Sequence, residues 1–161
     1  MTKPELTIRP ATIEDCTQIL RFVTELAIYE KAEHEVVATE EHFKQTLFCD
    51  NPKAFCLIAE TNEGAVGFAI YFYSFSTWLG KLGIYLEDLY VTPEQRGIGA
   101  GKALLKRLAT IALENDCGRV EWSVLDWNEP SIKFYEAMGA KIKDGWLVYR
   151  LAGEALTNFA D

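Results

Sequence analysis

The sequence predicts an α+β domain in which a central mixed β-sheet is flanked by helices. Apolar residues recur at helical spacing in the first third of the chain, three consecutive β-rich segments follow, and a glycine-rich turn then leads into an amphipathic helix. At 161 residues the chain is most simply a single domain spanning 1–161. A chain of this length buries roughly 70% of its unfolded surface.

The N-terminal part is predicted to be mainly helical after one short strand at residues 6–9. Thr12, which acidic residues follow, is a candidate N-cap for a helix that reaches about Tyr29. Thr39 opens a second helix that ends near Phe48. The apolar stripe of the first helix is expected to face the sheet.

The rest of the chain alternates strands with two further helices. The predicted strands are 54–60, 66–75, 85–91, 119–125, 141–143 and 146–151, and the predicted helices are 99–115 and 130–138. With the first strand, this order gives a mixed sheet of about seven strands.

Composition limits the classes of partner. A formal charge of −8 disfavours a nucleic-acid surface and would attract cationic small molecules, although many proteins are acidic only for solubility. The N-terminus has no apolar signal core and the apolar run 66–73 is too short to cross a bilayer, which favours a cytoplasmic protein without membrane contact. The four cysteines include no C-x-x-C pair, so we expect reduced thiols and no metal site.

The most informative stretch joins the strand 85–91 to the helix 99–115 through an arginine and three alternating glycines. These residues are Arg96, Gly97, Ile98, Gly99, Ala100, Gly101 and Lys102. At a helix N-terminus, free N–H groups and the helix dipole favour anions, and glycines let a diphosphate approach the main chain. The stretch therefore predicts a phosphate cradle, with an ordinary glycine-rich helix entry as the alternative.

Two other phosphate motifs do not fit this stretch. A dinucleotide fingerprint that starts at Gly97 would need glycine where Lys102 stands, and a P-loop would need Ser or Thr where Ala103 stands. Arg96, Gly99 and Gly101 instead fill the pattern Arg-x-x-Gly-x-Gly. This pattern resembles the coenzyme A signature of the GNAT acetyltransferases.

A second segment strengthens the resemblance. Residues 127–140 read Trp-Asn-Glu-Pro-Ser-Ile-Lys-Phe-Tyr-Glu-Ala-Met-Gly-Ala and resemble the other signature of that superfamily. Asn128 suits a helix cap, Pro130 suits a first turn, and Gly139 suits the left-handed residue that ends a helix. Ordered matches at 8–12, 25–30, 66–69, 78–81 and 85–88 resemble the spermidine/spermine and thialysine N-acetyltransferases over essentially the whole chain.

The resemblance implies a GNAT fold in which splayed strands hold acetyl-CoA as co-substrate, and a homodimer. Backbone groups near Leu89 and Val91 would hold the pantetheine arm and polarise the thioester. The candidate coenzyme-binding residues are Leu89, Tyr90, Val91, Arg96, Gly97, Ile98, Gly99, Ala100, Gly101, Lys102, Asn128, Pro130, Ser131 and Tyr135.

The resemblance also supplies catalytic candidates. Tyr135 is the candidate general acid, because a phenol with a pKa of about 10 stays protonated at neutral pH. Glu87 is the candidate base and would act through ordered water, because a carboxylate is a weak base for an alkylammonium. In a regular strand the adjacent Asp88 would point to the opposite face of the sheet, although a bulge would change that. A structural salt bridge is an equally good interpretation of Asp88.

The acceptor in this family is a primary amine on a small cationic molecule. The candidate contacts are Tyr29, Glu30, Ser76, Glu87, Trp122 and Asp144. Ser76 stands where the spermidine-acetylating members carry an acid, which resembles the thialysine-acetylating branch. The Gly83 region is one residue longer than the family pattern. Two alternatives remain open from the sequence: a catalytically silent acyl-CoA sensor, and an acetyltransferase of protein amines.

Overall fold

The computed structural model describes residues 5–161, and the chain divides into two compact units. The first unit is Met1–Ser123 and the second is Val124–Asp161. Each unit is described by itself below. The glycine-rich turn lies in the first unit and the helix with Tyr135 lies in the second.

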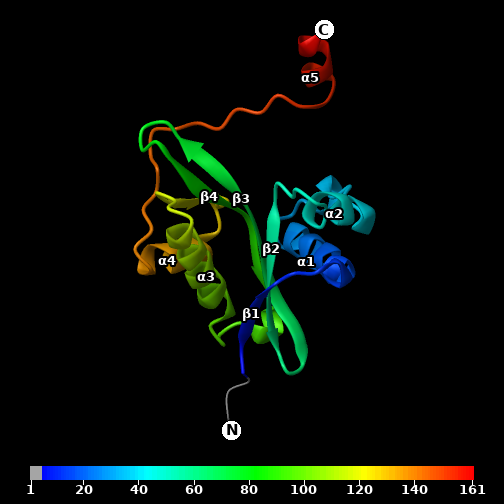
Figure 1. Ribbon diagram of the computed structural model, residues 1–161, viewed down its shortest axis with the longest axis vertical. Coiled ribbons are helices and arrows are strands. Elements are labelled where there is room, and N and C mark those ends of the chain that lie inside the picture. The colour runs from blue at the N-terminus through cyan, green and yellow to red at the C-terminus, as the bar shows by residue number, and fades with distance from the viewer. Residues whose placement is uncertain (1–4) are drawn as a thin grey trace. The chain divides into compact units, whose positions relative to one another are not determined.

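A mixed sheet forms the centre of the first unit (Figure 1). Its five strands follow the order β1-β2-β3-β4-β5, with the first four antiparallel and β4 and β5 parallel. The strands are β1 (Thr7–Pro10), β2 (Phe55–Thr61), β3 (Gly64–Ser76), β4 (Lys81–Val91) and β5 (Val120–Trp122). The predicted α+β class with a mixed sheet is confirmed.

Helices cover both faces of this sheet (Figure 1). On one face lie α1 (Cys16–Tyr29) and α2 (Glu40–Leu47), and on the other lies α3 (Ala100–Glu114). The first face buries a core of Ile19, Phe22, Leu47, Cys56, Ile58, Phe68, Ile70 and Tyr90. Within it the rings of Phe22 and Phe68 lie 5.3 Å apart between their centroids. The apolar stripe predicted for α1 therefore packs against β2, β3 and β4.

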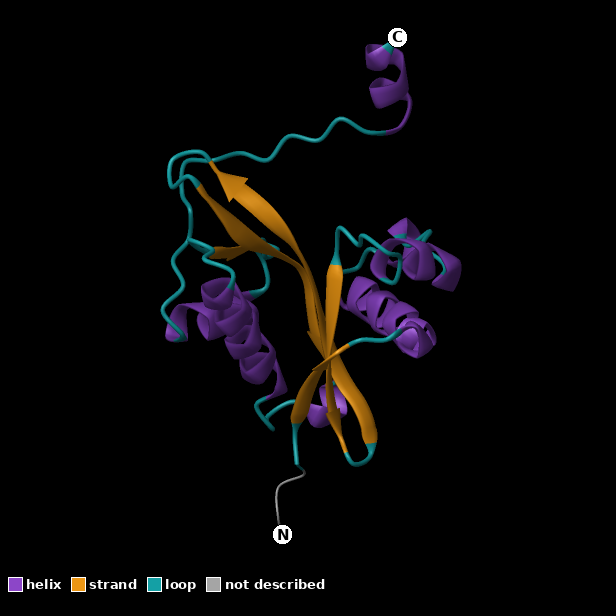
Figure 2. Cartoon of the chain, viewed as in Figure 1, coloured by secondary structure: helices purple, strands orange, loops and turns teal. Residues whose placement is uncertain are grey.

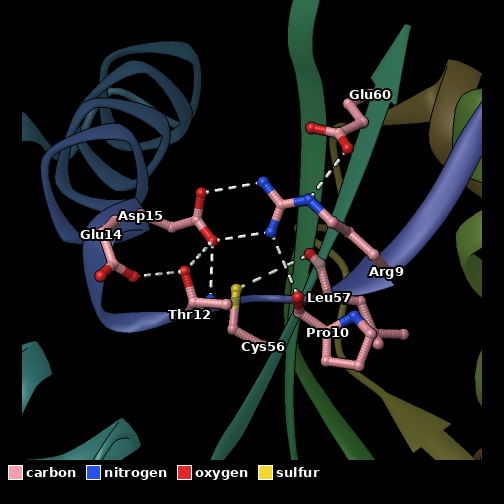
Figure 3. Close-up of polar contacts among 8 residues, drawn as sticks. All are labelled: Arg9, Pro10, Thr12, Glu14, Asp15, Cys56, Leu57 and Glu60. Atoms are coloured by element: carbon pink, nitrogen blue, oxygen red, sulfur yellow. Dashed lines mark hydrogen bonds and ion pairs between the residues drawn. The ribbon is translucent and has the colours of Figure 1, made fainter.

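An ion-pair network fixes the start of α1 to the sheet (Figure 3). The Arg9 guanidinium donates two hydrogen bonds to Asp15, of 2.8 and 3.0 Å, and a third of 3.0 Å to Glu60. Asp15 also accepts the backbone N–H of Thr12 at 2.7 Å. The Arg9 guanidinium holds the pKa of Asp15 below its usual value. The network joins β1, β2 and the short 3-10 turn Ile13–Asp15 before α1.

The hairpin of β3 and β4 is longer than predicted (Figure 2). β4 begins at Lys81 rather than 85, and its pairing with β3 continues to Ser76 opposite Lys81. The hydroxyl of Ser76 accepts the N–H of Leu79 at 3.2 Å, and the Ser76 carbonyl accepts the N–H of Gly80 at 2.8 Å. Cross-strand hydrogen bonds and this turn extend the strand beyond the apolar run that marks it in the sequence.

The second unit corrects the predicted C-terminus. It contains α4 (Glu129–Ala137) and α5 (Gly153–Ala160), but the predicted strands 141–143 and 146–151 are not strands. The sheet of the described chain therefore has five strands rather than about seven. A β-rich composition needs a hydrogen-bonding neighbour to become a strand, and residues 141–150 are exposed throughout. The sequence-based prediction also missed α5, whose core Glu-Ala-Leu has high helix propensity.

Candidate active site

The glycine-rich turn opens α3 with two left-handed residues. Gly97 and Gly99 have φ of +95° and +87°, and Gly99 is the residue that caps the helix. A Cβ built on either residue would meet no heavy atom within 4 Å. The glycines are thus required by the backbone conformation rather than by crowding, and the space beside them is open. An anion approaching the N–H groups of the first turn of α3 would enter that space. The residues fit the diphosphate of coenzyme A.

The parallel strands β4 and β5 separate beside this turn. Their pairing covers Ile84–Leu86 against Val120–Trp122 and ends there, whereas β4 continues to Val91. On its other side, β4 stays paired with β3 as far as Val91 opposite Gly67. The backbone of Leu89, Tyr90 and Val91 therefore has a strand neighbour on one side only among residues 5–161. The splayed strands that the resemblance implies require such an unpaired edge of β4, and β5 itself ends at Trp122.

A β-bulge interrupts β4 at Glu87. Ile70 lies opposite Asp88 and Tyr71 lies opposite Leu86, so Glu87 is the extra residue. In a bulge, two residues of one strand face a single residue of its neighbour, and strict alternation is lost. The expectation that Asp88 points to the face opposite Glu87 applies to a regular strand, and the bulge removes that premise. The side chain of Asp88 shares the α1 face of the sheet with its partner Ile70.

The bulge brings carboxylates together at this face. Burial is the main cause that raises the pKa of Asp88 to about 6, and the negative charges of Glu87 and Glu30 contribute to the same shift. Burial also raises the pKa of Glu30, the residue that follows α1. Three acidic side chains from two elements are thus close enough to interact. Their combined charge favours a cation such as an ammonium group.

Aromatic and charged contacts hold α1 against the C-terminal half of β4. The rings of Phe22 and Tyr90 lie 6.0 Å apart between their centroids. Burial and Glu25 raise the pKa of Tyr90 to about 12. Tyr29, one turn further along α1, has the guanidinium of Arg96 over its ring at 5.6 Å. Tyr29, Tyr90 and Arg96 are all predicted site residues, but no spacing in the sequence indicates these contacts.

Two further candidates of the first unit occupy structural positions. The side chain of Ser76 is buried and lies in the hairpin turn described above. Trp122 is half-buried at the end of β5, opposite Leu86.

The remaining candidates of the glycine-rich turn differ in exposure. Ile98 is half-buried, Ala100 is buried at 2% exposure and Lys102 is exposed. Ala100 can therefore offer a ligand only its backbone.

In the second unit, the local chemistry predicted for α4 is present. The side-chain oxygen of Asn128 accepts the N–H of Ser131 at 3.4 Å, and Pro130 lies in the first turn. Tyr135 is half-buried near the end of the helix, and Gly139 follows with φ of +97°. Asp144 is exposed, and its carboxylate accepts the N–H of Gly145 at 3.0 Å. Asn128 is therefore a helix cap, as its position in the sequence predicts.

Comparisons with known proteins match this architecture. The model of the acetyltransferase (GNAT) family matches residues 21–140. The chain belongs to this family. It is 40% identical to the thialysine N-epsilon-acetyltransferase of Bos taurus, over 95% of this chain and 96% of that protein. It is 38% identical to the human spermidine/spermine N(1)-acetyltransferase-like protein 1, over 95% of this chain and 23% of that longer protein.

A solved structure shares the GNAT fold of this chain. It is an integron cassette protein from the mobile metagenome of V. cholerae, with a TM-score of 0.82, 27% identity, and coverage of 96% of this chain and 97% of that chain. The chain is thus an acyltransferase, and GNAT acetyltransferases use acetyl-CoA as co-substrate.

Among residues 5–161, no group of three or more His, Cys, Asp or Glu side chains is arranged to hold a metal ion. None of the helices in the described chain is both long and apolar enough to cross a lipid bilayer.

Proposed function

We propose that this protein transfers the acetyl group of acetyl-CoA to the primary amine of a small cationic acceptor, in a ternary complex. A thialysine-like amino acid is the best candidate, ahead of a diamine or polyamine. The observation that carries the proposal is the bulge in β4, where the charges of Glu87 and Glu30 act on Asp88, in a chain whose α3 opens on the uncrowded glycines Gly97 and Gly99. The 40% identity to a thialysine N-epsilon-acetyltransferase supports the choice of acceptor.

Coenzyme binding is assigned to backbone groups. The N–H groups of residues 96–101 would take the diphosphate, and Leu89, Tyr90 and Val91 would take the pantetheine arm on the free side of β4. When bound, acetyl-CoA supplies an acetyl group already activated as a thioester. An N–H of the splayed strand would stabilise the oxyanion that forms at its carbonyl.

The acidic cluster, which consists of Glu87, Asp88 and Glu30, is proposed to bind the ammonium group and to accept its proton. An alkylammonium with a pKa of about 10.4 is neutral in about one molecule in 2,500 at pH 7, a deficit of about 4.6 kcal/mol. Asp88 is proposed to share this proton with Glu87, because a carboxylate whose pKa is raised to about 6 is a stronger base than an ordinary aspartate. The proton reaches the pair through ordered water. Glu30 and Tyr29 hold the ammonium before it loses the proton.

Tyr135 is proposed to return a proton to the departing thiolate. The departing thiolate takes the phenol proton as its bond to the acetyl carbon breaks; because a thiol has a pKa of about 8.5 and a phenol about 10, the transfer is uphill by about 1.5 pKa units, and the phenolate then regains a proton from solvent. Ser76 is proposed to disfavour a long polyamine only through the carboxylate that it lacks, because its own hydroxyl accepts the N–H of Leu79 in the hairpin turn. Asp144 and Trp122 are proposed to contact a compact zwitterionic acceptor. A homodimer in the cytoplasm remains part of the proposal on the basis of the family resemblance.

The decisive experiment incubates the purified protein with acetyl-CoA and a panel of amines. The panel holds thialysine, spermidine, a short diamine and a peptide with a free N-terminus. Free CoA thiol is quantified together with the mass of the acetylated product, using the protein at catalytic amounts because Cys49 is an exposed thiol. We expect thialysine to give the highest kcat/KM.

A Tyr135→Phe variant separates an enzyme from a sensor. Turnover should fall by about 10²- to 10⁴-fold while CoA affinity stays unchanged, because the hydroxyl contributes only to proton transfer. Binding of CoA without any product from the wild-type protein would indicate the sensor. Preferential acetylation of the peptide would indicate a protein acetyltransferase.

A further inference from the structure

The first residue of the glycine-rich turn contacts the last residue of α1. The guanidinium carbon of Arg96 lies over the ring of Tyr29, 5.6 Å from its centroid. The Nε of Arg96 donates to the carbonyl of Val91 at 3.4 Å. One arginine therefore joins the proposed diphosphate turn, the end of β4 and the end of α1.

This geometry leaves the Arg96 side chain able to bind an anion while it stays on the ring. Within residues 5–161, the two Nη groups of Arg96 have no hydrogen-bond or ion-pair partner. A guanidinium stacks through its face and donates hydrogen bonds along its edge, so both contacts can exist together. A diphosphate on the Nη edge would restrict Arg96 without displacing Tyr29.

Tyr29 links the Arg96 side chain to the acidic cluster, because it is the sequence neighbour of Glu30. Tyr29 precedes Glu30, whose charge raises the pKa of Asp88. Earlier in α1, Phe22 packs against Tyr90 of β4. The backbone of the last turn is closed by the N–H of Ala32, which donates to the carbonyl of Ala27 at 2.8 Å, and the contact of Tyr29 with Arg96 ties this turn to the coenzyme turn. Ordering Arg96 would order the Glu30 carboxylate as well.

We propose that Tyr29 is a positioning residue that couples the coenzyme turn to the acceptor site. Occupation of the turn by the diphosphate of CoA fixes Arg96, the fixed guanidinium holds the ring of Tyr29, and Glu30 is then ready to meet the acceptor ammonium. Acceptor binding is tighter after coenzyme binding, and by linkage the coenzyme binds more tightly to the acceptor complex by the same factor. This inference rests on the proposed function.

The test is a binding cycle measured by calorimetry with CoA, which cannot react, and thialysine. In the wild-type protein, saturating CoA should tighten thialysine binding by about two- to tenfold, as expected for one cation–π contact. The same factor should appear in CoA affinity when thialysine is saturating. Tyr29→Leu should bring the ratio of affinities close to one. Tyr29→Phe keeps the ring face and should keep the ratio, even if loss of the hydroxyl weakens thialysine binding in both states.

Thermal melts of the two variants show whether they are folded. Equal ratios in wild type and a folded Tyr29→Leu protein would overturn the coupling, and so would loss of the ratio in Tyr29→Phe. If Tyr29→Leu does not fold, Tyr29→Phe and Arg96→Gln test the coupling instead. Tyr29→Phe should keep the ratio of thialysine affinities with and without CoA, and Arg96→Gln, which lacks the guanidinium charge, should bring this ratio close to one. Failure of the wild-type protein to bind CoA would overturn the proposed function and this inference together. CoA binding without coupling overturns the inference alone.

Discussion

Asp88 shows how one backbone irregularity changes the chemistry of a residue. In a regular strand its carboxylate would point away from Glu87, but the bulge in β4 places it on the α1 face beside two other acids. Its pKa of about 6 lies above the ordinary value of 3.8. The native state therefore binds more protons than the unfolded state between about pH 4 and 6, and stability falls as pH rises through this window.

An Asp88→Asn variant should accordingly be more stable than the wild type at pH 7. The gain should be about 1 to 3 kcal/mol and should shrink toward pH 4, where the aspartate is already neutral. Urea denaturation at several pH values measures it. Acetyl transfer should fall in the same variant, because the amide cannot accept the proton of the amine. Lower stability at pH 7, or unchanged turnover, would contradict this account.

Asp116→Asn is the matched control for that experiment. The Asp116 side chain is 86% exposed and its ion pair with Lys81 lies at the surface. Exposed pairs contribute up to about 1 kcal/mol, so a small loss of stability is expected at pH 7 rather than a gain. A gain of stability in Asp88→Asn and a loss in Asp116→Asn would distinguish the effect of relieving a buried charge from the effect of removing an exposed one.

The sequence could not show that Asp88 lies on the α1 face with Ile70, because a bulge depends on the register between two strands. The same limit applies to the contact of Arg96 with Tyr29, since 67 positions of sequence, from 29 to 96, separate the partners. Asn128, in contrast, was predictable as a helix cap because its partner Ser131 is three residues away. Local hydrogen bonds leave a signature in the sequence, whereas contacts between elements do not.

At the scale of elements, the turn before α3 depends on glycines that face open space. Gly99→Ala should cost about 1 to 2 kcal/mol of stability, because an L residue is strained at a φ of +87°. Its Cβ would meet no protein atom within 4 Å but would enter the space proposed for the diphosphate. CoA affinity measured by calorimetry should therefore fall by about tenfold or more in a folded protein.

Gly80→Ala provides the matched control for the glycine turn. Gly80 lies in the β3–β4 hairpin with φ of +64°, and a Cβ there also meets nothing within 4 Å. This variant should lose a similar amount of stability and should keep its CoA affinity. An equal loss of CoA affinity in both variants would mean that destabilisation, rather than obstruction of the turn, explains the result.

Most elements follow from local pattern. The helical stripe predicts α1, the apolar runs predict β2, β3 and β4, and the glycine turn predicts the start of α3. The exceptions lie at residues 141–151, where Trp146, Leu147, Val148 and Tyr149 have the composition of a strand and exposures from 66% to 90%. β-propensity measures packing against neighbouring strands, so composition alone cannot create a strand without a ladder partner.

At the scale of the whole molecule, excess acidic charge should act on the rate of encounter with the acceptor. The chain has 16 basic and 24 acidic residues, a net charge of −8. Long-range attraction depends on the charge of the partner and weakens as salt shortens the Debye length from about 10 Å at 0.1 M to about 3 Å at 1 M. At pH 7 spermidine carries about three positive charges and thialysine a net charge of about one.

Raising NaCl from about 50 to 500 mM should therefore lower kcat/KM for spermidine by about tenfold and for thialysine by about twofold, because only encounter and binding are screened. Steady-state assays with both amines at each salt concentration measure the two slopes. The control is kcat at saturating amine, which should change little for either substrate, since the chemical step occurs inside the site. Thialysine should consequently gain in relative specificity as salt increases. Equal slopes for the two amines would show that the net charge serves solubility and that the local carboxylates alone govern acceptor binding.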